Sequence, residues 1–273
     1  MKLKSLISRF GNKHSEKSSM QAREKHATLS DTKDKAGWVS PAYSRSRAVY
    51  LDPNILAANR CVAMFPGSPE AEYYKILRTH ILRQTQDQGG RSVMITSAIP
   101  GEGKTVTSIN LALTFAKEFE QTVLLVDCDL RKQSIHEVMG FESDRGLLNH
   151  LLDGMPVPDL IVWPGIEKLT VISGGKTIHE SSEVIASPQM RELVADMKAR
   201  YPERYMFFDV PPILAGADAL AFAPLVDWII MVVQAGKTPI PEIKRALQML
   251  PKKKVLGLIL NRQTSKVKTY PYL

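Results

Sequence analysis

The sequence has few cysteines and no long apolar segment. Its 273 residues include two cysteines, Cys61 and Cys128, and these form no CxxC or Cys/His pattern. We therefore expect neither a disulfide framework nor a structural zinc site, which suits a reducing compartment. There is no run of about 18 apolar residues, and the N-terminus lacks the apolar core and cleavage site of a secretory signal. We therefore expect a cytoplasmic protein without a membrane span.

Positive charge is concentrated near the N-terminus. The formal net charge is +8, and residues 1–60 hold 12 Lys or Arg against 5 Asp or Glu. A protein that binds nucleic acid usually carries its basic side chains on a folded face. Here they lie in a segment that is mostly polar and shows little apolar periodicity. We therefore predict that residues 1–60 form a basic, disordered N-terminal segment, and we expect no nucleic-acid partner.

The first ten residues contain one short helical pattern. Leu3, Leu6, Ile7 and Phe10 fall at positions i, i+3, i+4 and i+7, and the basic residues lie mostly off this stripe. Two interpretations stay open: a frayed terminus, or a weak contact with a membrane surface through residues 1–10.

From residue 61 onward, short apolar runs alternate with longer amphipathic stretches. The runs that we interpret as strands are Ser92–Thr96, Val123–Asp127, Leu169–Ile172, Met206–Asp209, Trp228–Val233 and Val255–Leu260. Helical patterns occur at 68–84, 105–119, 133–152, 187–200, 217–225 and 240–250. Strands that are apolar throughout are buried on both faces, as in parallel sheets covered by helices. We predict an α/β fold with a doubly wound, mostly parallel sheet and helices on both faces over residues 61–262, followed by a C-terminal tail at 263–273.

The first predicted strand runs into the sequence SAIPGEGKT at 97–105. This is the Walker A pattern of the P-loop NTPases, with Ala98 where the strict form has its first glycine. Small residues let backbone N–H groups surround a phosphate, and the following helix adds its positive N-terminal dipole. Lys104 is expected to reach the β- and γ-phosphates of ATP. The predicted ATP-binding residues of this loop are Pro100, Gly101, Glu102, Gly103, Lys104, Thr105 and Val106.

Three aspartates follow apolar strands. Asp127 and Asp129 close the run VLLVDCD and, because strand side chains alternate, share one face. Asp209 closes MFFD ahead of two prolines, the Walker B form whose acid holds the Mg²⁺ shell. Ligands of open α/β sheets bind at the carboxyl ends of the strands. We therefore predict that Thr105, Asp129 and Asp209 bind Mg²⁺, and that the three aspartates act with Lys104 in catalysis.

Together these motifs resemble those of the bacterial tyrosine kinases (BY-kinases) of capsule and exopolysaccharide operons, notably the autokinase type of exosortase-linked loci. The segment VDCDLRK, with Arg131, is similar to the family's Walker A′ motif, and VLGLILN ends in Asn261, where the family reads adenine. The resemblance implies an ATP-dependent protein-tyrosine autokinase that regulates exopolysaccharide biosynthesis, polymerisation or export. It points to Asp127 as the base that accepts the tyrosine proton, although the assignment among the three acids stays open.

The resemblance also implies partners. Glu72, Lys75 and Arg78 are similar to the family's ExxRxxR oligomerisation motif, with Lys75 in the first Arg position, where the planar fork of Arg is lost. The family phosphorylates C-terminal tyrosines of a neighbouring copy, and the tail here offers Tyr270 and Tyr272. We expect a homo-oligomer, a membrane chain-length-determinant or co-polymerase protein as partner, and a peripheral location at the inner face of the plasma membrane.

Two departures from the family and one rival interpretation are visible. The segment HESSEVIAS from His179 is a poor match to the family's NPxELLxS, and Gln133 stands where proline usually follows the DLR segment. The rival is a non-kinase P-loop ATPase of the partition or septum-positioning type, or another nucleotide-dependent regulatory switch. The loop of those ATPases carries a signature lysine where this chain has Ile99. The substitution favours the kinase interpretation.

Overall fold

The sheet has eight strands and is mostly parallel. A computed structural model of the chain describes residues 46–86 and 88–264. The strands in chain order are β1 (Arg47–Ala48), β2 (Ser92–Ser97), β3 (Thr122–Asp127), β4 (Val162–Trp163), β5 (Leu169–Ile172), β6 (Arg204–Asp209), β7 (Trp228–Gln234) and β8 (Val255–Asn261). Across the sheet they follow the order β1-β4-β5-β3-β6-β2-β7-β8. Of the described pairs, β4–β5 is antiparallel and the others are parallel.

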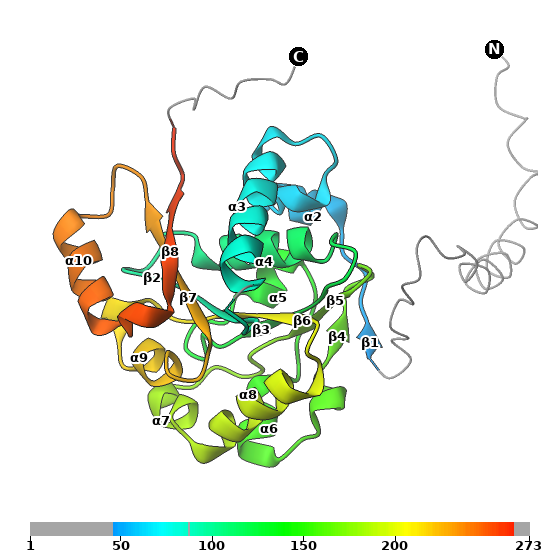
Figure 1. The fold of residues 1–273 in the computed structure, drawn as a ribbon. Coiled ribbons are helices and arrows are strands. Elements are labelled where there is room, and N and C mark those ends of the chain that lie inside the picture. Colours follow the sequence, from blue (N-terminus) through cyan, green and yellow to red (C-terminus); the bar gives the residue numbers. More distant parts are fainter. Residues whose placement is uncertain (1–45, 87, 265–273) are drawn as a thin grey trace, which may run out of the picture. The chain divides into compact units, whose positions relative to one another are not determined.

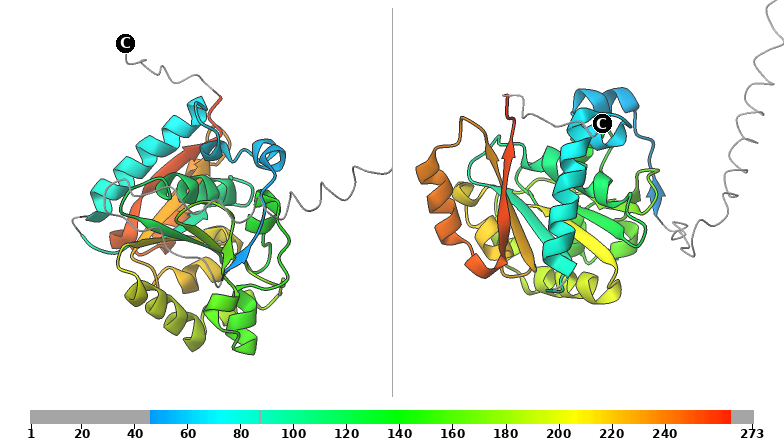
Figure 2. Two further views of the ribbon diagram at one scale, coloured as in Figure 1. Left: turned by 90° about the vertical axis from the view of Figure 1, so that its right-hand side faces the viewer. Right: turned by 45° about the horizontal axis from the view of Figure 1, so that its top comes forward.

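Helices cover both faces of this sheet (Figures 1 and 2). They are α2 (Pro53–Ala58), α3 (Pro69–Gln86), α4 (Lys104–Phe115), α5 (Ile135–Met139), α6 (Leu147–Asp153), α7 (Ser181–Ile185), α8 (Pro188–Arg200), α9 (Asp218–Phe222) and α10 (Ile240–Met249). One buried apolar cluster lies under α2–α5 and includes Leu56 and Phe115. The other lies under α6–α10 and includes Leu193 and Phe222. The predicted doubly wound α/β architecture is confirmed.

The central strands bring the predicted site residues to one edge of the sheet. β2 and β3 are buried along their whole length. β3 pairs with β6 so that Asp127 lies beside Asp209, and Asp209 has Ile95 of β2 as its neighbour on the other side. The Walker A loop follows β2 directly. The loop and two aspartates therefore emerge at the carboxyl ends of three adjacent parallel strands, where ligands of such sheets bind.

All six predicted strands are present, and their ends differ from the prediction by at most two residues. β1 and β4 were not predicted, because a strand of two residues contains no readable alternation. The short helices α2 and α7 were also not predicted. Each spans fewer than two turns, too short for an apolar periodicity to repeat.

The single helix predicted over 133–152 is wrong. The segment forms α5 and α6, separated by residues 140–146. Gly140 ends α5 in a left-handed conformation (φ 78°), the conformation in which glycine commonly stops a helix. Its amide donates to the carbonyls of His136 and Glu137, and so closes the last turn.

The predicted boundary at residue 60 is also wrong. Residues 46–60 carry β1 and α2, and Leu51 and Leu56 are buried in the cluster under α2–α5. Asp52 accepts a hydrogen bond from the Asn54 amide (2.8 Å) and Pro53 begins the helix, so α2 has a capped N-terminus. The folded domain therefore begins before residue 61.

The amphipathic pattern at residues 1–10 lies outside the described residues. Within the described ranges, no helix combines the length and the apolar character needed to cross a bilayer.

Candidate active site

The loop between β2 and α4 has the backbone of a phosphate-binding loop. Gly101 and Gly103 adopt φ angles of 84° and 91°, a left-handed region that glycine enters without strain. A Cβ atom at Gly103 would lie 2.2 Å from Asn261 Nδ2, so a side chain there would have to displace the Asn261 amide. α4 begins at Lys104 and directs its first amides towards the loop. The Walker A loop thus has the shape that phosphate binding requires.

Lys104 lies among carboxylates at the end of this loop. Its Nζ is 2.8 Å from Asp129 Oδ2 and 3.2 Å from Asp209 Oδ2. Burial lowers the pKa of Lys104, but the negative charges of Asp209 and Asp129 outweigh burial and raise its pKa above the ordinary value. The ammonium group therefore stays charged, and it is held at the point where loop, β3 and β6 meet.

Two hydroxyls of α4 also bind Asp209. Thr105 Oγ1 donates to Asp209 Oδ2 (2.6 Å), and Ser108 Oγ donates to Asp209 Oδ1 (3.0 Å). Sequence reasoning identified Thr105 but missed Ser108. Ser108 follows Lys104 by four residues in α4. The helical repeat alone therefore places the side chains of Lys104 and Ser108 on one face, the face that meets β6.

The oxygen atoms of Thr105, Asp129 and Asp209 fit a hard divalent cation. All three side chains surround Lys104 Nζ, and oxygen ligands are those that Mg²⁺ prefers. In the described part of the chain, no group of three or more carboxylate, imidazole or thiol side chains could hold a metal alone. In nucleotide sites, Mg²⁺ is commonly held by one or two carboxylates together with phosphates and water.

Asp127 is fully buried and its carboxylate is already hydrogen-bonded. Oδ2 accepts from the amides of Ser134 and Ile135 (3.0 Å each), and Oδ1 accepts from the Asp129 amide (3.1 Å). Burial, followed by the negative charge of Asp209, raises the pKa of Asp127 to about 7. A carboxyl group with this pKa can change its protonation state near neutral pH, as a general base must.

Ser134 is a second residue that sequence reasoning missed. Its hydroxyl lies 3.2 Å from Thr105 Oγ1, while its amide binds Asp127. It therefore connects the predicted metal ligand to the predicted base. No sequence signal marked it, because its position depends on how the loop after β3 turns back towards α4.

The side chains of three predicted nucleotide-binding residues are hydrogen-bonded within the protein. Arg131 Nε lies 2.7 Å from Ser181 Oγ and 3.2 Å from Asp218 Oδ2, which ties it to α7 and α9. The side chain of Glu102 is 1% exposed and bonds within the protein, so that residue offers its backbone alone to a ligand. Asn261 Nδ2 donates to the Glu102 carbonyl (2.8 Å), which brings the end of β8 against the Walker A loop.

The residues of the predicted oligomerisation motif lie on α3. Lys75 pairs with Glu72 of the same helix (2.5 Å), and both side chains are exposed. Arg78 instead turns towards α4, donating to the Thr114 carbonyl (2.9 Å) and pairing with Glu118 (2.7 Å). Arg78 therefore has partners within the chain, and the motif's role between copies stays a prediction.

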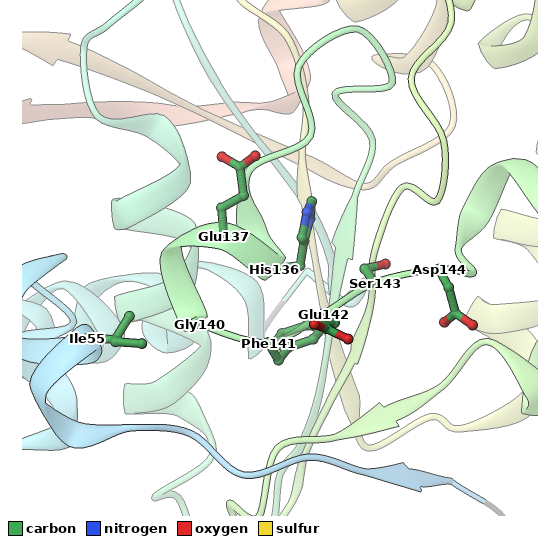
Figure 3. Close-up of a pocket in the computed structure, with 8 residues that line it drawn as sticks. All are labelled: Ile55, His136, Glu137, Gly140, Phe141, Glu142, Ser143 and Asp144. Carbon is green, nitrogen blue, oxygen red and sulfur yellow. The ribbon is translucent and has the colours of Figure 1, made fainter.

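A cavity of about 600 Å³ lies along α5 (Figure 3). It is lined by Ile55, His136, Glu137, Gly140, Phe141, Glu142, Ser143 and Asp144. Figure 3 shows the side chains of His136 and Glu137 projecting from α5 in the same direction, and Asp144 at the far end of the segment that follows α5. None of the predicted nucleotide-binding residues lines it. This cavity is therefore distinct from the Walker A site, although α5 connects the two.

The region that is similar to known proteins includes the whole Walker A site. Residues 90–269 match the family model described as ParA: NUBPL iron-transfer P-loop NTPase. The tyrosine-protein kinase YwqD of Bacillus subtilis is 35% identical over 234 residues, which span 85% of this chain and 95% of YwqD. The succinoglycan biosynthesis transport protein ExoP of Rhizobium meliloti is 32% identical over 209 residues, 75% of this chain and 26% of that longer protein. The crystal structure of the VpsO kinase domain superposes with a TM-score of 0.63 at 32% identity, covering 71% of this chain and 95% of that domain.

Proposed function

We propose, from the premise that this chain belongs to the ParA-type P-loop NTPases and, within them, to the bacterial tyrosine kinases, that it is an autokinase controlling exopolysaccharide polymerisation or export. Family membership makes it an enzyme that transfers phosphate from ATP to protein tyrosine. The observation that carries the proposal is Lys104 Nζ, held 2.8 Å from Asp129 and 3.2 Å from Asp209 beside the phosphate-binding loop. The name of ExoP links that relative to succinoglycan biosynthesis, and this supports the polysaccharide part.

In the proposed reaction, the tyrosine oxygen bonds to the γ-phosphorus of ATP while the bond from that phosphorus to the β–γ bridging oxygen breaks. Lys104 exchanges its carboxylate partners for phosphate oxygens and neutralises their charge. Thr105, Asp129 and Asp209 would hold Mg²⁺, which supplies further charge neutralisation when bound. Asp127, whose pKa is about 7, accepts the phenolic proton.

The proposed phosphoacceptors are Tyr270 and Tyr272 of a neighbouring copy. Both lie outside the described residues, so the proposal rests on the resemblance to the family and on the two tyrosines near the end of the chain. The proposed activator is a membrane chain-length-determinant or co-polymerase protein. It would place this kinase at the inner face of the plasma membrane, where ATP is available.

The rival function is a nucleotide-dependent switch without kinase activity, which this fold also supports. Position 99, where the partition ATPases carry their signature lysine, is an isoleucine whose amide is bound by Glu102 (2.8 Å). This departure and the three buried acids favour phosphoryl transfer.

Incubation of the purified protein with labelled ATP and Mg²⁺, followed by detection of phosphotyrosine, tests the proposal. We expect label on tyrosine, and we expect Lys104→Ala to lower the rate by about a hundredfold or more. Lys253→Ala is the matched control, because Lys253 is exposed in the 3-10 turn that precedes β8, at the end of that strand opposite the loop. ATP consumption by the wild-type protein without any phosphotyrosine would reject the autokinase and support the switch.

A further inference from the structure

Glu102 is a buried acid inside the phosphate-binding loop. Its side chain is 1% exposed, although the neighbouring Gly101 lies at the surface. Oε2 accepts from the Ile99 amide (2.8 Å), and so closes the loop across three residues. A carboxylate that accepts hydrogen bonds from backbone N–H groups is stabilised without a cationic partner. The carboxylate therefore accepts hydrogen bonds from within the protein and is not exposed to an incoming phosphate.

The other oxygen of Glu102 reaches the turn between β7 and α10. Oε1 accepts from the Gln234 amide (3.2 Å) and from the Thr238 hydroxyl. Thr238 Oγ1 also accepts from the Gln234 amide (2.9 Å), so the three groups form a closed set of bonds. One side chain thus contacts the start of the loop, the last residue of the neighbouring strand β7, and Thr238 in the turn after it.

The backbone of Glu102 binds a third element. Its carbonyl accepts from Asn261 Nδ2 (2.8 Å), at the carboxyl end of β8. The loop is consequently tied to β7 and β8 on one side, while Lys104 ties it to β3 and β6 on the other. The loop has Ala98 in place of the first glycine of the strict motif, and a side chain supplies the constraint that holds its shape.

We propose that Glu102 is a positioning residue for ATP. Through its bonds to Ile99 and Thr238, it holds the loop amides in the phosphate-binding shape before the nucleotide arrives. The reason is that donors already in place cost no reorganisation when the phosphates bind. Loss of the bonds should therefore weaken ATP binding more than the phosphoryl-transfer step itself. This inference rests on the proposed nucleotide site.

Glu102→Gln and Thr238→Val, singly and combined, test the proposal. Glutamine keeps the size of the side chain but presents an N–H group to one of the amides, and valine removes the hydroxyl. We expect each single variant to raise the KM for ATP about tenfold, with kcat lowered less than about threefold and the KM for an acceptor peptide of residues 264–273 unchanged. The KM for ATP of the double variant should be no higher than that of the single variant with the higher KM, because the two residues belong to one set of hydrogen bonds.

Two further variants separate positioning from general stability. Thr238→Ser keeps the hydroxyl and should restore the wild-type KM. Asp227→Asn removes another carboxylate that accepts from a strand amide, that of Ser92 (3.1 Å), at the amino ends of β2 and β7. It should lower the melting temperature without changing the KM for ATP.

The results overturn the proposal if Glu102→Gln lowers the melting temperature as Asp227→Asn does and leaves the KM for ATP unchanged, or if the effects of Glu102→Gln and Thr238→Val multiply. If Glu102→Gln does not fold, Thr238→Val alone decides, since it leaves the acid in place. Failure of the wild-type protein to bind ADP in a direct titration would instead reject the nucleotide site, and the positioning role with it.

Discussion

The charge state of Asp127 depends on the fold. Its ordinary pKa is about 4, and burial together with the charge of Asp209 raises it to about 7. Below about pH 4 the carboxyl is protonated in both the folded and the unfolded chain. Between about pH 4 and about pH 7 only the unfolded chain ionises, which favours unfolding. The stability that the proton provides is therefore lost across this interval and does not change above it.

This pH dependence can be measured as a difference between variants. Without nucleotide and Mg²⁺, the free energy of unfolding of the wild-type protein minus that of Asp127→Asn should fall from about pH 4 to about pH 7, by at most about 4 kcal/mol. Urea unfolding at several pH values measures it. Asp227→Asn is the control. In the wild-type protein, the hydrogen bonds of Asp227 and its contact with Lys198 outweigh burial and lower the pKa of its carboxyl group. The contribution of Asp227 to the free energy of unfolding therefore changes below about pH 4. A wild-type minus Asp127→Asn difference that stays flat over the interval would contradict the raised pKa.

At the scale of elements, α2 shows that the folded domain includes residues that composition assigned to a disordered segment. Leu56 is 1% exposed within the cluster under α2–α5, whereas the adjacent Ile55 is 38% exposed. We expect Leu56→Ala to lower the free energy of unfolding by about 3 kcal/mol, and Ile55→Ala by about 1 kcal/mol. Chemical denaturation of both variants tests this. Equal small losses would show that α2 adds little to the core.

The elements that could be predicted are those with a repeating pattern. The six longer strands are apolar along their length, and the glycine-rich loop between β2 and α4 has a recognisable sequence. α2 was missed because its six residues span fewer than two turns, too few for an apolar periodicity to repeat. The break between α5 and α6 was missed because the apolar spacing continues through Gly140, and the left-handed conformation that ends α5 leaves no mark in the periodicity.

The site was predictable in part, for a similar reason. Lys104 and the three aspartates carry motif signals, and the structure places them around one point. Ser134 carries none, because tertiary contacts bring it to Thr105. Arg131 has a motif signal, yet it lies with Ser181 and Asp218 because Asp218, buried on α9, needs a cationic partner.

At the scale of the whole molecule, the C-terminal tail starts beside the active site. β8 runs parallel to β7, and Asn261 at its end contacts the Walker A loop. From Gln263 to Tyr272 the tail could extend roughly 33 Å. Distance from the phosphates therefore gives no reason for transfer between copies, and the expectation of transfer in trans rests on the family resemblance alone.

A mixture of two variants tests transfer between copies. The first is Lys104→Ala with its tail intact, and the second is an active copy with Tyr270→Phe and Tyr272→Phe. We expect mass spectrometry to find phosphate on the tail of the first variant, with a rate that rises with the concentration of the second. If that tail stays unmodified while the wild-type protein labels its own at a concentration-independent rate, transfer occurs within one chain.

The ion pairs around Lys104 also determine the charge balance of the site before any ligand binds. One ammonium group faces three buried carboxyl groups, those of Asp127, Asp129 and Asp209. With a proton on Asp127, one negative charge is left over, and a second appears when that proton leaves. Buried charge without a counter-charge is costly. Free ATP would add to this excess, whereas its metal complex brings a divalent cation. We therefore expect the site to bind the metal complex of ATP in preference to free ATP because the site lacks positive charge. This preference does not depend on how well the adenine ring fits.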